Sequence, residues 1–131
     1  MQEVYEFLKS CGVYYLATAE GDQPRVRPFG TIDLLEGKLY IQTGKIKAVA
    51  QQMMANPKVE ISAMAADGRW IRIAALAILD ENIKAQEHML DAYPNLKAMY
   101  TAGDGNTAVY YLKDATAQIC SFADAPRSIS F

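Results

Sequence analysis

Hydrophobic and polar residues alternate along much of this 131-residue chain, as they do in β-strands with one buried face. The alternation and the many aromatic and β-branched residues predict six strands, over residues 13–19, 24–33, 38–43, 58–64, 69–79 and 109–122. Short turns such as Asp67-Gly68 join neighbouring strands, which is typical of antiparallel hairpins. We therefore expect a mainly β fold, a six-stranded antiparallel barrel with helices packed at its ends.

Helical periodicity is limited to shorter segments. Residues 2–11 carry apolar side chains at the i, i+3, i+4, i+7 spacing and are followed by Gly12, a residue that favours helix termination. Further helices are predicted over residues 44–55, over residues 80–92 with Asp80 as N-cap, and over a short segment from Asn95. No internal repeat or linker divides the chain, so residues 1–131 are predicted to form a single domain.

The composition is that of an ordinary globular domain. Hydrophobic residues make up 51% of the chain and charged residues 21%, which argues against disorder. The formal net charge of −2 gives no sign of a nucleic-acid or anionic-membrane partner. No apolar run is long enough to cross a membrane, and the N-terminus lacks the features of a signal peptide. These observations predict a cytoplasmic protein without nucleic-acid or membrane partners.

The cysteine and histidine inventory excludes several kinds of catalytic and metal site. Cys11 and Cys120 are far apart and each falls on an apolar face, so we expect buried free thiols rather than a disulfide or a metal site. His88 is the only histidine and lies within a predicted helix, where we expect it to be exposed to solvent. A His-based zinc site and a Ser-His-Asp or Cys-His catalytic arrangement are therefore not expected.

The junction between the strand at residues 38–43 and the helix after it indicates an anion site. Thr43 is the predicted N-cap, and Lys45 and Lys47 fall in the first helical turn, where the helix dipole disfavours cations. Free backbone N–H groups, a hydroxyl and two ammonium groups at one place favour a phosphate. The spacing is not that of a P-loop. A solvated helix start explains the same residues and remains the alternative.

The strand at residues 24–33 carries further candidate ligand-binding residues. Arg25 and Arg27 project to one face, and arginine can bind a phosphate through two parallel hydrogen bonds. Pro28 has no N–H and indicates an edge or a bulge, and Gly30 would let a flat ligand approach the backbone closely. A solvated strand face remains the alternative for the two arginines.

Trp70, the only tryptophan, is flanked by Arg69 and Arg72 on the next long strand. An indole is often plain core, but the neighbouring arginines make the edge of a ligand site or of a subunit interface an equal alternative.

Four motifs in this order resemble a known family. They are QPRVRPFG at residues 23–30, LYIQTGKIK at 39–47, NPKV at 56–59 and RWIRI at 69–73. With nearly the whole chain, they resemble the FMN-binding split-barrel proteins related to pyridoxamine 5′-phosphate oxidase. The resemblance is greatest to the short bacterial subgroup that includes the nitroimidazole-resistance proteins. It implies a split-barrel homodimer with FMN in two clefts at the subunit interface.

The resemblance also implies roles for individual residues. Arg27, Thr43 and Lys47, with the backbone at Gly44, would hold the FMN phosphate. The other implied contacts are Pro28, Phe29 and Gly30 against the flavin ring, Gln42 at the ribityl chain or ring, and Trp70 and Arg72 from the partner subunit.

The function expected from this resemblance is that of an FMN-dependent oxidoreductase acting on a small molecule. The C-terminal substrate-phosphate residues of the pyridoxamine phosphate oxidases have no counterpart in residues 121–131, and the histidine associated with nitroimidazole reduction has no matching position. The alternatives are a flavin-binding module without turnover, or a split barrel that binds haem or the deazaflavin F420. His88 is the only imidazole available to haem, and the net charge gives little support for the acidic tail of F420.

Overall fold

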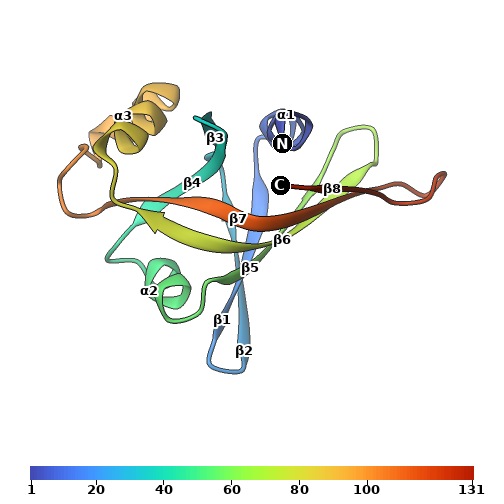
Figure 1. The fold of residues 1–131 in the computed structure, drawn as a ribbon, viewed down its shortest axis with the longest axis horizontal. Helices are drawn as coiled ribbons and strands as arrows, with labels where there is room; N and C mark the ends of the chain where they lie inside the picture. The colour runs from blue at the N-terminus through green and yellow to red at the C-terminus, as the bar shows by residue number, and fades with distance from the viewer.

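The computed structural model describes residues 1–131 and is built around one antiparallel sheet of eight strands, curved into a split barrel (Figure 1). The strands are β1 Tyr14–Glu20, β2 Gln23–Phe29, β3 Asp33–Leu35, β4 Lys38–Gly44, β5 Lys58–Met64, β6 Trp70–Asp80, β7 Thr107–Cys120 and β8 Arg127–Ser130. The helices are α1 Gln2–Cys11, α2 Ala48–Ala55 and α3 Ile83–Ala92, with a 3₁₀ helix, η1, at Pro94–Ala98.

β7 joins the two halves of the sheet. The strand order is β2-β1-β5-β6-β7-β4-β3, and β8 pairs with the C-terminal half of β7. β7 bends where its register against β6 shifts between Ala74 and Leu76, and Asp114 there adopts a φ of 51°. A bulge of this kind increases the local twist.

The core lies inside the barrel and follows the predicted alternation. In β5, Val59, Ile61 and Ala63 are buried while the residues between them are exposed. α1 closes one end of the barrel through Val4 and Leu8, and α2 packs on β1 at the other side. α3 covers β3 and the start of β7 through a separate small cluster.

The prediction of six strands is wrong in number, although the mainly β class is confirmed. The second strand ends at Phe29 rather than residue 33, because the chain crosses between strands and re-enters the sheet as β3. β3 has three residues and β8 has four, too few for alternation to be recognised. α3 is capped by Asn82, whose side chain accepts a hydrogen bond from the N–H of Lys84 (3.0 Å), and not by Asp80.

None of the helices combines the length and the apolar character that a membrane crossing requires.

Candidate functional site

A cavity of about 220 Å³ opens where the end of β2, the end of β4 and the start of α2 meet. We call it the β2–β4 cavity. It is lined by Arg27, Pro28, Phe29, Gly30, Thr31, Gln42, Thr43, Lys47 and Val49. Seven of the ten residues expected at the cofactor site lie in this lining, and Gly44, Trp70 and Arg72 do not.

Thr31 ties the two strands of the cavity together. Its hydroxyl accepts a hydrogen bond from the backbone N–H of Gln42 (3.1 Å), and its carbonyl oxygen accepts one from the hydroxyl of Tyr14 (2.5 Å). Tyr14 is fully buried. The segment after β2 is therefore held against β4 by a core residue, so the cavity has a fixed floor.

Gln42 provides a buried amide that has no hydrogen-bond partner. Gln42 belongs to the lining of the cavity, its exposed fraction is 6%, and neither Oε1 nor Nε2 finds a partner in the chain. Leaving a buried amide unsatisfied costs about 1–3 kcal/mol per group, so native proteins rarely tolerate it without a ligand or water. One residue of the cavity lining therefore keeps a side-chain donor and a side-chain acceptor unpaired.

Arg27 and Lys47 give the cavity its positive charge. Arg27 donates only to neutral oxygens: the carbonyl of Leu16 (3.3 Å), Thr18 Oγ1 (2.7 Å) and Gln52 Oε1 (2.6 Å). Burial and the nearby Arg25 charge lower the pKa of Arg27, but a guanidinium stays protonated at neutral pH. No carboxylate pairs with either cation, whereas Lys45 is bound to Glu81 (2.9 Å).

The predicted N-cap role of Thr43 is wrong. α2 starts at Ala48 with Lys47 as its N-cap, so Lys45 and Lys47 precede the first turn. The reason is a distant residue, Asn106, whose carbonyl oxygen accepts a hydrogen bond from Lys45 N (2.8 Å) and whose Oδ1 accepts one from Ile46 N (3.1 Å). These bonds hold residues 45–47 in a turn before α2, which Lys47 N closes by donating to Gly44 O (3.0 Å). Thr43 and Lys47 still meet in the cavity lining.

The glycines at positions 30 and 44 have different surroundings. A Cβ on Gly44 would lie 3.2 Å from both Asn106 Nδ2 and the Tyr100 hydroxyl, so packing within the chain accounts for this glycine. A Cβ on Gly30 would meet only the carbonyl oxygen of Gly12, at 3.8 Å, and Gly30 has no positive φ. Nothing in the chain itself requires a glycine at position 30, which faces the cavity.

Trp70 and Arg72 lie on the outer face of the sheet. Trp70 packs on Phe122 with ring centroids 5.0 Å apart, and Arg72 donates to Gln118 Oε1 (3.0 Å). In cross-strand register Arg72 is separated from Pro28 by Ser62 and Tyr15, a row that crosses β6, β5, β1 and β2. Three strand spacings amount to about 14 Å. Arg72 does not line the cavity of its own copy.

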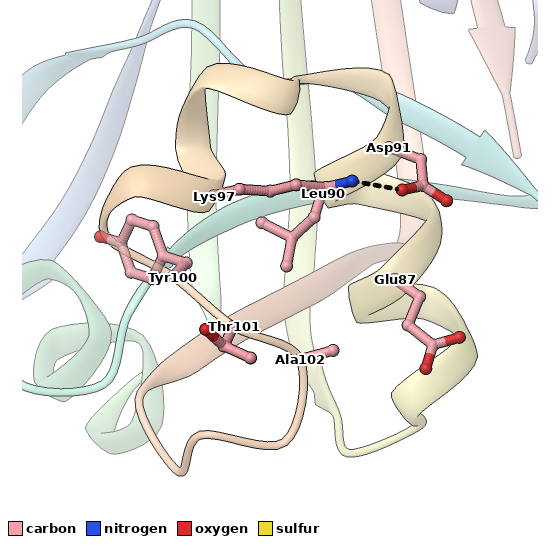
Figure 2. A pocket seen from close by; sticks show the side chains of 7 residues that line it. All are labelled: Glu87, Leu90, Asp91, Lys97, Tyr100, Thr101 and Ala102. Atoms are coloured by element: carbon pink, nitrogen blue, oxygen red, sulfur yellow. Dashed lines mark hydrogen bonds and ion pairs between the residues drawn. The ribbon is translucent and has the colours of Figure 1, made fainter.

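A second hollow, of about 370 Å³, has a different character (Figure 2). It lies between α3, η1 and the segment after η1, and its charged lining residues are Glu87, Asp91 and Lys97. Lys97 donates to Asp91 (2.9 Å), as Figure 2 shows, which leaves Glu87 as the unpaired charge. This hollow does not suit a phosphate.

His88 is exposed to solvent, as expected, with 47% of its side chain accessible, but it is also paired. Its Nδ1 lies 2.5 Å from Oδ2 of Asp33, a buried carboxylate on β3. Asp33 was not recognised because β3 is too short to be predicted. The pair ties α3 to the sheet and does not line the β2–β4 cavity. Cys11 is partly buried and Cys120 buried, and both are free, as expected.

Sequence reasoning missed four residues at or beside the cavity: Thr31 and Val49 in its lining, and Thr18 and Gln52 against Arg27. Thr18 occupies an inward position of β1, and Gln52 lies on the apolar stripe of α2. A polar residue at a core position was the signal that could have found both, because such a residue needs a buried partner.

A solved structure of a NimC/NimA family protein from Clostridium acetobutylicum is 48% identical to this chain, with a TM-score of 0.96. The match covers 100% of this chain and 92% of that one. The chain belongs to the NimC/NimA family. This confirms the resemblance to the short bacterial subgroup that the motifs indicated. No protein-family model and no curated protein matches the chain.

More distant structures show that the NimC/NimA fold is shared with proteins of several descriptions. A putative pyridoxamine 5′-phosphate oxidase from Listeria innocua is 18% identical, with a TM-score of 0.66, over 99% of this chain and 96% of that one. A FAD-binding protein from Mesorhizobium loti is 16% identical, with a TM-score of 0.61, over 92% and 94%. A heme-binding protein from Mycobacterium smegmatis is 18% identical, with a TM-score of 0.78, over 98% and 56%. At these identities the likeness shows the fold alone.

Proposed function

We propose that this protein binds FMN in the β2–β4 cavity and acts as an oxidoreductase on a small molecule. One observation carries the proposal: Arg27 and Lys47 share the lining of the cavity, and neither has a carboxylate partner. A phosphate monoester carries about −1.5 to −2 charges at neutral pH. Two free cations therefore match the terminal phosphate of FMN.

The remaining lining fits the rest of such a ligand. The unpaired amide of Gln42 can donate to and accept from a ribityl hydroxyl or a polar edge of the ring. The open space at Gly30 and the neighbouring Pro28 and Phe29 suit a flat ring lying against the backbone. A flavin would thereby satisfy the one buried amide that the chain leaves without a partner.

The protein's part in the chemistry is to bind and orient. When bound, the flavin supplies the electron transfer, as cofactors of this kind do. Arg27 and Lys47 would fix the phosphate, and Gln42 would set the depth of the ligand. No side chain of the cavity is assigned as a catalytic acid or base, because Arg27 and Lys47 are its only charged members.

The open face of the sheet supports the proposed homodimer. Val26 is 67% exposed, Met64 63% and Tyr15 52%, and all three lie on the face that the helices leave uncovered. Exposed apolar side chains gathered on one face are typical of interaction sites. A second copy on this face would also offer Trp70 and Arg72 to the opposite cavity, whereas neither residue lines the cavity of its own copy.

Flavin titration of the purified protein tests the proposal. We expect one FMN per chain, bound more tightly than riboflavin because riboflavin lacks the phosphate. Lys47→Ala should weaken FMN binding about tenfold, since a charge-assisted hydrogen bond contributes about 1.5–3 kcal/mol. Lys45→Ala is the matched control and should leave binding unchanged, because Lys45 already pairs with Glu81. Wild-type protein that does not prefer FMN to riboflavin would overturn the phosphate site.

Two further measurements separate the alternatives. Reduction of bound flavin by NADH or NADPH supports an oxidoreductase, and a tightly bound flavin that neither donor reduces indicates a module without turnover. Titration with haem and with F420 addresses the other cofactors of split barrels. The only imidazole of the chain, His88, is held by Asp33 outside the cavity, which favours flavin over haem.

A further inference from the structure

Arg27 is held by neutral groups at one end of its guanidinium. Nη1 donates to Leu16 O and Thr18 Oγ1, and Nη2 donates to Gln52 Oε1. Thr18 is 3% exposed and Gln52 7%, so these partners are parts of the core rather than of the surface. Thr18 Oγ1 and Gln52 Oε1 are also 2.6 Å apart, in a hydrogen bond that joins β1 to α2.

The count of donors shows what is left for a ligand. A guanidinium has five N–H donors, and three of those on Arg27 are used within the chain. The remaining Nε–H and the second Nη2–H lie on one edge of the planar group. That edge is the one that binds two oxygens of a phosphate or carboxylate in parallel.

The amide of Gln52 has only one orientation that suits its neighbours. Its Nε2 donates to Glu20 Oε2 (3.3 Å), which directs Oε1 toward Arg27. The other oxygen of Glu20 accepts from Arg25 (2.8 Å). The neutral amide of Gln52 therefore lies between the carboxylate of Glu20 and the guanidinium of Arg27.

We propose that Gln52 is a positioning residue that presents the free edge of Arg27 to the ligand phosphate while keeping the Glu20 carboxylate away from it. This inference rests on the proposed function, in which Arg27 binds the phosphate. Gln52 fixes the orientation of the Arg27 guanidinium without bringing a negative charge next to it. A carboxylate at the same place would form an ion pair with Arg27 and cancel the charge that attracts the anion.

The substitution Gln52→Glu tests this directly because it keeps the shape of the side chain and adds the charge. We expect affinity for FMN to fall about 10- to 100-fold, the range of one charge-assisted hydrogen bond, while affinity for riboflavin stays within about twofold. Gln51→Glu is the matched control. It adds the same charge to the residue of α2 that precedes Gln52. Gln51 is exposed, so this variant should leave FMN binding within about twofold of wild type.

A second pair of variants covers the event that Gln52→Glu does not fold. Thr18→Val removes a partner of Arg27 and should reduce the preference for FMN over riboflavin several-fold, and Thr18→Ser should restore it. Wild-type protein without a preference for FMN would overturn the proposed function, and this inference with it. A preference that is intact in both Gln52→Glu and Thr18→Val would overturn the role of Gln52 alone.

Discussion

Asn106 and Ile46 are joined by a 3.1 Å hydrogen bond from the backbone N–H of Ile46 to the side-chain oxygen of Asn106. The carbonyl oxygen of Asn106 accepts a second bond, from Lys45. The loop before β7 thus delays the start of α2 and determines where Lys47 enters the cavity lining. A residue that never touches the cavity fixes its geometry.

Asn106→Ala should therefore weaken FMN binding several-fold, because it releases the segment that carries Lys47. The loss of one hydrogen bond should also lower the free energy of unfolding by about 1 kcal/mol. Flavin titration and chemical denaturation measure the two effects. Asn95→Ala, at an exposed position in η1, is the control and should change neither. Unchanged FMN affinity in Asn106→Ala would show that this loop does not position the site.

Asp104 organises the same loop in a pH-dependent way. Backbone N–H groups of Thr107, Thr101 and Asn106 donate to its carboxylate and hold the pKa of Asp104 well below its usual range. A lowered pKa stabilises the fold above the unfolded value of about 3.9, and this stabilisation is lost as the pH falls below it.

Asp104→Asn should accordingly be less stable than wild type at pH 7, with a difference that shrinks between about pH 4 and pH 2. Denaturant unfolding at pH 7, 5 and 3 measures this. Asp22→Asn, in the exposed β1–β2 turn, should show no such trend. A difference for Asp104→Asn that does not vary with pH would contradict the assignment.

Gly30→Ala should separate binding from stability. Its Cβ would meet no atom closer than 3.8 Å, so the free energy of unfolding should change by less than about 0.5 kcal/mol. FMN affinity should nevertheless fall about tenfold or more, because the methyl group occupies the space proposed for the ring. Gly37→Ala should behave in the opposite way, losing about 1 kcal/mol at a φ of 75° and keeping its FMN affinity. Normal FMN binding by Gly30→Ala would place the ring elsewhere.

Mixing variants tests whether Arg72 acts from the partner subunit. Arg27→Ala and Arg72→Ala should each bind FMN poorly, but dimers that contain one chain of each carry one intact site. Refolding equal amounts together should restore about a quarter of the sites. A mixture of Arg27→Ala and Lys47→Ala is the control and should restore none, because both residues line the cavity of the same copy. No restoration in the first mixture would rule out a contribution of Arg72 in trans.

The six longer strands and most of the cavity lining could be predicted from local sequence, whereas β3, β8 and the start of α2 could not. Residues 58–64 alternate between core and solvent, and they form β5 as expected. Thr43 has the local properties of an N-cap, but Asn106, far along the chain, holds residues 45 and 46 in a turn, so α2 begins only at Ala48. The local pattern of hydrophobic and polar residues predicts which side chains are buried. It does not predict a hydrogen bond from a loop that is distant in sequence.

The same limit applies to the surroundings of Arg27. The motif at residues 23–30 identified Arg27 as a candidate ligand-binding residue, and in the structure Arg27 lines the cavity. Its partners Thr18 and Gln52 come from β1 and α2, and only the packed barrel brings them together. These partners decide whether the positive charge of an arginine is paired with a carboxylate or remains available to an anionic ligand. The availability of that charge is therefore a property of the fold.

The row from Pro28 to Arg72 has a last consequence. Three strand spacings lie between these residues in one copy, and in the proposed homodimer the ligand contacts Arg72 of the partner subunit and so bridges two copies. The bound molecule would then form part of the dimer interface. Ligand binding and dimer formation would be linked equilibria, each of which stabilises the other. Diluting the protein should release the ligand even when the ligand remains in excess, and adding ligand should draw separated chains back together.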